Sequence, residues 1–308
     1  MATLLQRLAS LVQDPLPDFV FEITESGVAF ARPATGAPPG FAPLEPGILS
    51  ISPMTDNVLR PDALADRIRS LEGAETSRKK RGSAVVILPD YASRVAVLAF
   101  DQFPADPKDQ LALVRFRMKK SVPFDVDSAV IGFHPQAVGK ASGKYSEKSR
   151  TEVVVAVAVL EIVARYEAAF RAAGLQPGLV TTASMATAEL LGDSGISVLA
   201  RLSGRYLTVL VTNGTAVRLV RTVELPETTA DEILGVLFPT LAYVEDEMGS
   251  VANRLHVIGM DEAGRVPDWV SELQIPVEPL RSRYGTPGPS NAGLLGYLQS
   301  VSVGARAA

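Results

Sequence analysis

The chain has 308 residues, a hydrophobic fraction of 47%, a formal net charge of -4 and no cysteine. The length is sufficient for two domains, and the lack of cysteine excludes disulfides, thiol nucleophiles and cysteine-ligated metals. The small negative charge gives no general attraction to nucleic acid, and no apolar run reaches the roughly 18 residues of a membrane span. These properties favour a cytosolic or peripherally attached α/β protein.

The N-terminal half is predicted to alternate short strands with helices. Leucines at helical spacing over residues 1–13 predict a helix that packs on the body or touches a membrane. The basic run at 78–81 is interpreted as a solvated loop, with contact to anionic lipid as the alternative. The other predicted elements are strands at 19–24, 28–32, 48–51, 84–88, 94–100 and 129–135, a Pro- and Gly-rich surface loop at 33–47, and helices from Pro61 and Asp106.

Residues 151–191 have the clearest pattern in the chain. The run at 153–159 is apolar and rich in β-branched residues, which is typical of a strand buried on both faces. A helix follows and stops at Gly174. A second strand at 179–182 then leads into a helix that Ser184 is predicted to cap. The order strand, helix, strand, helix predicts an α/β crossover within one parallel or mixed sheet.

The C-terminal half is predicted to begin a second structural unit after a junction at 192–195. A hairpin and a long helix containing Pro239 are its strongest features. The predicted elements are strands at 197–202, 206–212, 215–223, 255–259 and within 270–277, and helices at 229–248 and 291–301.

The polar residues offer little support for an enzyme. His134 and His256 are interpreted as structural because neither has a partner at metal-ligand spacing. The acids at 245–247 occupy consecutive helical positions, which point in different directions, and they are interpreted as a solvated face. Ser184 and Ser203 lack the context of a catalytic nucleophile, and no phosphate-binding glycine motif is present. The sequence therefore predicts no catalytic residue and no metal site.

Three stretches resemble the PilM family of actin-like proteins, with the cytoplasmic domain of GspL as a near neighbour. They are AVVILPDYASRVAVLAFDQFPADPKDQLALVRFRMKKSVPFDVDSAVIGFHPQ at 84–136, RYEAAFRAAGLQP at 165–177, and the strand pair with its long helix at 197–248. The resemblance implies an α/β, actin-like (ribonuclease H-like) fold with two lobes. The first lobe would span 1–192, with a small α/β insertion subdomain at about 90–148, and the second would span 193–308.

The resemblance also implies three nucleotide-binding loops, in which glycines let the backbone approach the phosphates. This sequence departs from the family pattern in each loop. The first Asp-x-Gly motif aligns with Glu22-Ile23-Thr24, and the second aligns with Arg201-Leu202-Ser203, so Arg201 would face Glu22 across the cleft and form a salt bridge with it. The remaining departures are Ala29, where the family has a lysine, and a single glycine, Gly259, in the third loop. We therefore expect no cofactor, and neither ATP nor magnesium.

The loss of the three motifs favours a non-catalytic scaffold. The resemblance implies that this scaffold is an adaptor on the cytoplasmic face of the inner membrane, serving a type IV pilus or a related secretion machine. Its partner would be the N-terminal tail of a PilN-like bitopic protein, together with other platform proteins, and no nucleic acid. The tail would lie extended in a groove beside the insertion subdomain. The predicted groove residues are Arg115, Lys119, Val122, Pro123 and Phe124.

Three alternatives remain open from the sequence. Phe124 is equally well interpreted as a core residue. The chain is alternatively an active actin-like ATPase of the same machinery, or a GspL-like type II secretion component. GspL continues into a transmembrane helix, whereas this chain ends at Ala308 without one, and this difference favours PilM.

Overall fold

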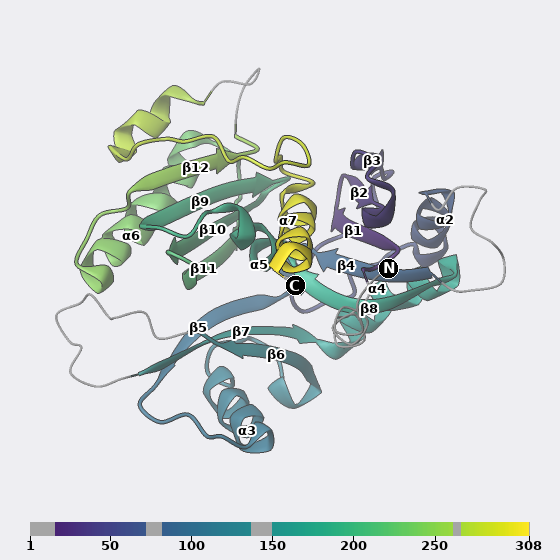
Figure 1. Cartoon of the computed structure of the whole chain (residues 1–308), viewed down its shortest axis with the longest axis horizontal. Helices are drawn as coiled ribbons and strands as arrows, with labels where there is room; N and C mark the ends of the chain where they lie inside the picture. The colour runs from purple at the N-terminus through teal and green to yellow at the C-terminus, as the bar shows by residue number, and fades with distance from the viewer. Residues whose placement is uncertain (1–15, 72–81, 137–149, 261–265, 308) are drawn as a thin grey trace.

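The computed structural model describes residues 16–71, 82–136, 150–260 and 266–307 (Figure 1). Within these residues the strands form three sheets, ordered β3-β2-β1-β4-β8, β5-β7-β6 and β11-β10-β9-β12. The helix predicted over residues 1–13 and the basic run at 78–81 lie outside the described residues. No helix of the described part of the chain is both long and apolar enough to cross a membrane.

The five-stranded sheet is covered by helices on both faces. Its strands are β1 (Phe19–Thr24), β2 (Gly27–Ala31), β3 (Gly40–Pro43), β4 (Gly82–Leu88) and β8 (Leu175–Thr182). Buried side chains of α2 (Pro61–Leu71) and α4 (Leu160–Ala173) pack on one face, and those of α5 (Ala183–Thr187) and α7 (Ala292–Ala307) pack on the other. β1 is parallel to β4, and β4 is parallel to β8. This arrangement places the ends of β1 and β4 side by side.

Two predictions for the segment before α2 were wrong. The presumed loop at 33–47 contains β3, which pairs antiparallel with β2 as the edge strand of the sheet. The presumed strand at 48–51 contributes only an isolated bridge between Leu49 and Val58. An edge strand needs hydrogen bonds on one side alone, so it tolerates the prolines that made this segment resemble a loop.

The three-stranded sheet corrects the interpretation of residues 151–191. Its strands are β5 (Arg94–Phe100), β6 (Ala129–Pro135) and β7 (Thr151–Val159), and β7 is antiparallel to both neighbours. β8 pairs with β4 in the other sheet, so β7, α4 and β8 do not form a crossover within one sheet. The three-stranded sheet thus extends past residue 148 to Val159.

Both faces of β7 are covered, as its apolar run predicted. Val153, Val155 and Val157 are buried against the core that α3 (Pro107–Met118) closes. Val154 and Ala156 pack against a cluster that includes Val217 and Val220 of the second lobe. The alternation of the run identifies a doubly covered strand, but it holds no information about which sheet the strand joins.

The four-stranded sheet and its long helix agree with the prediction. The strands are β9 (Ile196–Ser203), β10 (Tyr206–Asn213), β11 (Ala216–Glu224) and β12 (Arg254–Ile258). α6 (Ala230–Met248) begins at Thr229, whose hydroxyl accepts the Glu232 N–H. The strand predicted within 270–277 was wrong: Asp268–Leu273 is a 3-10 helix, and Val277 forms only an isolated bridge.

The C-terminal helix α7 returns to the first lobe and joins the two halves (Figure 1). A Cβ atom on Gly296 would lie 2.0 Å from the Ala186 carbonyl oxygen, so glycine is required where α7 crosses α5. α5 is capped by Thr182, whose hydroxyl accepts the Met185 N–H at 3.4 Å. The prediction that Ser184 caps this helix was therefore wrong.

Candidate functional site

A cavity of about 520 Å³ lies between the two lobes. Its polar wall comes from the β1–β2 turn, the end of β4 and the β9–β10 turn, which contribute Glu25, Asp90 and Ser203. Its apolar wall includes residues of the segment at 44–51 and Tyr206. The cavity therefore lies where the first two predicted nucleotide loops meet, and the residues of those loops determine which ligand can bind there.

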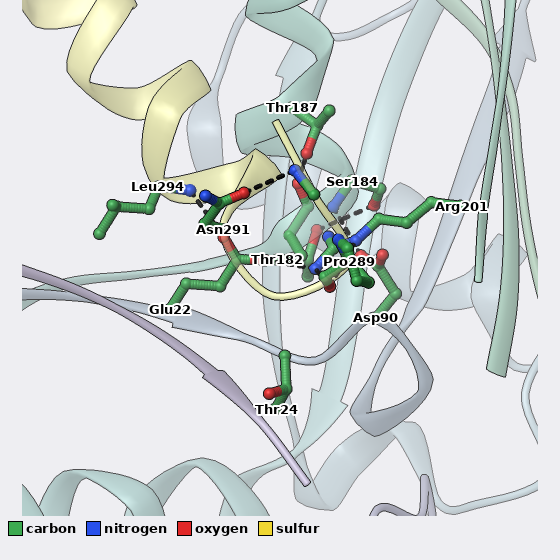
Figure 2. Close-up of polar contacts among 12 residues, drawn as sticks. Glu22, Thr24, Asp90, Thr182, Ser184, Thr187, Arg201, Pro289, Asn291 and Leu294 are labelled. Atoms are coloured by element: carbon green, nitrogen blue, oxygen red, sulfur yellow. Dashed lines mark hydrogen bonds and ion pairs between the residues drawn. The ribbon is translucent and has the colours of Figure 1, made fainter. Parts of the chain in front are cut away.

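The predicted salt bridge between Glu22 and Arg201 is confirmed (Figure 2). The two side chains are 0% and 4% exposed, so the ion pair is buried at the back of the cleft. One Glu22 carboxylate oxygen accepts the Arg201 Nη2–H. The other accepts the backbone N–H of Leu294 at 2.8 Å, near the start of α7. Both oxygens of the carboxylate are thus occupied by the chain itself.

Arg201 also binds the loop that precedes α7. Its Nε and Nη2 atoms donate to the Pro289 carbonyl oxygen at 3.1 and 2.6 Å. Its Nη1 atom is buried and has no hydrogen-bond partner among the described residues. The guanidinium therefore links β1, β9 and the approach to α7, three segments that are far apart in the sequence.

The charges around the cavity are mainly negative. Burial raises the pKa of Glu22 above its ordinary value, while Arg201 and the Leu294 N–H act in the opposite direction. The Asp90 carboxylate accepts the Ser184 N–H at 2.6 Å and, with Glu25, lines the cavity. Arg201 is the one cation among the described residues that line it. A polyphosphate placed here would meet carboxylates and a single cation that is already paired.

The residues at the three loop positions do not fit a magnesium-bound nucleotide. Each Glu22 carboxylate oxygen already accepts a hydrogen bond from the chain, and Arg201 places a cation where the family has a carboxylate. The Thr24 hydroxyl donates to the Gly27 carbonyl within its own turn at 3.0 Å. Ala29, the position of the family lysine, is a buried methyl group in β2. We derive no catalytic step through a nucleotide from this arrangement.

The fold itself requires a glycine at position 259. Its φ is +75°, and a Cβ atom there would lie 2.1 Å from the Leu202 carbonyl oxygen. It also lines a second cavity, of about 790 Å³, with Thr229 and Trp269. Packing against β9 alone therefore requires this glycine, and its retention does not indicate a ligand.

The five predicted groove residues lie together at the C-terminal end of α3. Lys119 and Arg115 approach Asp127 at 3.1 and 3.9 Å, so both cations brace α3 against the turn before β6. Val122 and Phe124 are half-buried against the core of the three-stranded sheet, and Pro123 is exposed. The core interpretation of Phe124 is therefore supported, and its contact with a partner stays a prediction.

The sequence did not indicate several contacts that fix the cleft. Tyr91 and Tyr206 stack across it with ring centroids 4.7 Å apart. The Tyr206 hydroxyl donates to the Ile51 carbonyl at 2.9 Å. The partners of Glu22 and Arg201 at Leu294 and Pro289 are backbone groups, which leave no signature in a sequence. Of these groups, only Glu22 and Arg201 could be identified from the sequence, because they replace the residues expected at two motif positions of the family.

Comparisons with solved structures identify the fold of the chain. No protein-family model and no curated protein sequence matches the chain. Among solved structures, the PilM-PilN type IV pilus biogenesis complex matches with a TM-score of 0.66 and 19% identity, over 93% of this chain and 99% of that one. The chain has the actin-like fold of PilM.

Two further structures are similar over most of the chain. A protein of actin-like ATPase fold and unknown function from Bacteroides thetaiotaomicron matches with a TM-score of 0.51 and 10% identity, over 91% of this chain and 94% of that one. The cytoplasmic domain of EpsL, an inner membrane component of the type II secretion system of Vibrio cholerae, has a TM-score of 0.49 and 14% identity, over 92% of this chain and 94% of that one.

Proposed function

We propose that this chain is a non-catalytic cytoplasmic scaffold of a type IV pilus assembly platform, bound at the inner membrane through the N-terminal tail of a PilN-like bitopic protein. The fold supports the assignment to this machinery, because the likeness to PilM extends over nearly the whole length of both chains. The match was solved as a PilM-PilN complex, and this favours a PilN-like partner over other classes.

The observation that carries the non-catalytic role is the Glu22–Arg201 ion pair. An ATPase of this fold needs a carboxylate free to hold magnesium and backbone open to the phosphates. Here Glu22 is buried and bonded through both oxygens, and Arg201 is bonded to Glu22 and Pro289. If the Glu22 carboxylate turned to bind a metal, the Arg201 guanidinium would stay buried without its counter-ion, which is strongly unfavourable.

We propose the C-terminal end of α3 as one wall of the tail-binding groove. Pro123 is exposed there, and Val122 and Phe124 are half-buried, so an extended peptide finds apolar contacts beside cations. Arg115 and Lys119 share Asp127, and a carboxylate of the tail would compete for the same two cations.

Calorimetric titration with ATP and magnesium, followed by a phosphate-release assay, tests the non-catalytic role. The proposal predicts no heat of binding and no turnover above the protein-free rate. Binding in the micromolar range with measurable turnover would instead identify an active actin-like ATPase of the same machinery.

Co-purification with the tail of the bitopic protein encoded beside this chain tests the partner. We expect Lys119→Ala and Phe124→Ala to weaken capture of the tail. Lys108→Ala, an exposed cation at the other end of α3, is the matched control and leaves capture unchanged. Preferential capture of a tail from a type II secretion system would instead support the GspL-like role.

A further inference from the structure

The three-stranded sheet contacts both lobes of the molecule. β7 ends at Val159 and α4 begins at Leu160, so the insertion enters the first lobe without an intervening loop. The sheet also approaches the second lobe, where β5 and β11 lie next to each other (Figure 1). The sheet therefore connects the two lobes, and the residues between it and β11 determine how firmly it does so.

One apolar cluster fills the space between the sheet and the second lobe. Val95 of β5 and Val217 and Val220 of β11 are buried in it, and Val154 and Ala156 of β7 pack against it. Four further members come from α7 and from the other strands of the second lobe: Ala292, Leu199, Leu210 and Ile258. Small, polar contacts between domains permit relative motion, whereas a large apolar contact restricts it. A rotation of the second lobe away from the insertion would expose these side chains to water, which is unfavourable.

A β-bulge in β11 lets two consecutive residues contact the insertion. The register of β11 against β10 shifts at this point, so that Arg218 is an extra residue between Val217 and Leu219. Consecutive residues of a regular strand point to opposite faces. Here Val217 is buried in the apolar cluster, and Arg218 forms an ion pair with Glu152 of β7. The Arg218 and Glu152 side chains are 20% and 34% exposed, so solvent screens this pair less than a fully exposed one.

The side-chain amide of Gln136 bonds to the outer edge of β11. β11 is an edge strand of its sheet, so its outward backbone groups need partners from elsewhere. The Gln136 Nε2–H donates to the Val217 carbonyl at 2.8 Å, and the Gln136 Oε1 accepts the Val217 N–H at 2.7 Å. The Gln136 backbone N–H donates to the Glu152 carbonyl at 2.8 Å. Gln136, Glu152, Val217 and Arg218 thus form a closed set of contacts, which we call the inter-lobe bridge.

The inter-lobe bridge is separate from the contacts that hold the lobes together at the cleft. There the Glu22–Arg201 ion pair and the stacked rings of Tyr91 and Tyr206 connect the lobes. None of these four residues belongs to the bridge or to its apolar cluster. A hinged protein closes by rotation about a few residues that absorb the movement. Separate sets of contacts oppose such a rotation, because movement about one set displaces the residues of the other.

We propose that the inter-lobe bridge holds the two lobes as one rigid body, so that the cleft keeps its width when the chain meets a ligand or a partner. Proteins that enclose a ligand between two lobes depend on movement of those lobes. In this chain such a movement would have to break the contacts of the insertion with one lobe or the other. The inference depends neither on tail binding nor on the identity of the partner.

Pulsed electron paramagnetic resonance measures the distance between the lobes directly. The chain contains no cysteine, so Asp62→Cys in α2 and Asp231→Cys in α6 provide two specific sites for spin labels. Both aspartates are exposed, and neither side chain forms an ion pair or a hydrogen bond with a described residue. We expect one narrow distance distribution, which is unchanged when ATP and magnesium are added.

Variants of the labelled protein test the role of the inter-lobe bridge. Glu152→Arg places two cations together and should broaden the distribution or add a second distance. Glu152→Arg with Arg218→Glu restores opposite charges and should recover the narrow distribution. Gln136→Ala removes both side-chain hydrogen bonds to β11 and should also broaden the distribution. Arg150→Ala is the matched control and should leave the distribution unchanged, because the ion pair of Arg150 with Asp101 lies within the insertion.

Three results would overturn the proposal. The first is a broad or double-peaked distribution in the labelled chain without further substitutions. The second is a shift of the distance when ATP and magnesium are added. The third is a distribution that stays narrow in both Glu152→Arg and Gln136→Ala, or that the charge-reversed pair fails to recover. Because recovery requires a folded chain, it distinguishes loss of the bridge from general unfolding.

Discussion

Replacing Arg201 by alanine tests the buried ion pair at the back of the cleft. The change leaves the Glu22 carboxylate 0% exposed, with only the Leu294 N–H as a partner. Removing one member of a buried ion pair costs about 3–5 kcal/mol, because the remaining charge stays in a medium of low dielectric constant. At roughly 2–3 °C per kcal/mol, Arg201→Ala should lower the melting temperature by about 10 °C.

The matched control replaces both charges. Glu22→Leu with Arg201→Met keeps similar side-chain volumes and leaves no unpaired charge, but the Leu294 N–H and the Pro289 carbonyl lose these side-chain partners. The melting temperature of this double variant should therefore lie between those of Arg201→Ala and wild type. Circular dichroism melting at pH 7 compares the three proteins. The ion pair does not stabilise the fold if Arg201→Ala melts within about 2 °C of wild type, or if the double variant melts below the single one.

Three further predictions concern the helices, the cleft and a buried histidine. In a urea titration, Gly296→Ala should lower the free energy of unfolding by about 1–3 kcal/mol, because its Cβ atom would lie 2.0 Å from the Ala186 carbonyl oxygen. The control Gly235→Ala should not destabilise the chain, because a Cβ atom on Gly235 would meet nothing within 4 Å. Tyr206→Phe should cost about 1 kcal/mol through loss of the hydrogen bond to the Ile51 carbonyl, and an unchanged urea midpoint would contradict that bond. Burial lowers the pKa of His256 below 6.5, so wild type should lose stability relative to His256→Asn as pH falls below 6.5, and parallel stability curves would exclude the histidine as the cause.

The second lobe was the part of the fold best predicted from sequence. The hairpin turn and the helical spacing of apolar residues are local signals, and the strands and the long helix formed where expected. The sheet to which β7 belongs was not predictable, because its valines fit any doubly covered strand. β3 was missed because its pairing with β2 outweighs a local composition of proline and glycine. The cap of α5 was misplaced by two residues, since Thr182 and Ser184 are chemically equivalent caps.

The candidate site was predictable only at its charged positions. Glu22 and Arg201 stood out because they replace motif residues of a family that the chain resembles, and their opposite charges suggested the salt bridge. The Pro289 carbonyl and the Leu294 amide complete the site from 88 and 272 positions away. Backbone groups are common to every residue, so only the fold reveals which of them turn toward the cleft.

The most direct test of the proposed function is a calorimetric titration of the chain with the N-terminal tail of its PilN-like partner, performed with and without ATP and magnesium. We expect saturable binding with the same Kd in both conditions, because the Glu22 and Arg201 side chains are paired with each other and do not fit a magnesium-bound nucleotide. Absence of tail binding by the folded chain, or an affinity that changes when ATP is added, would contradict it.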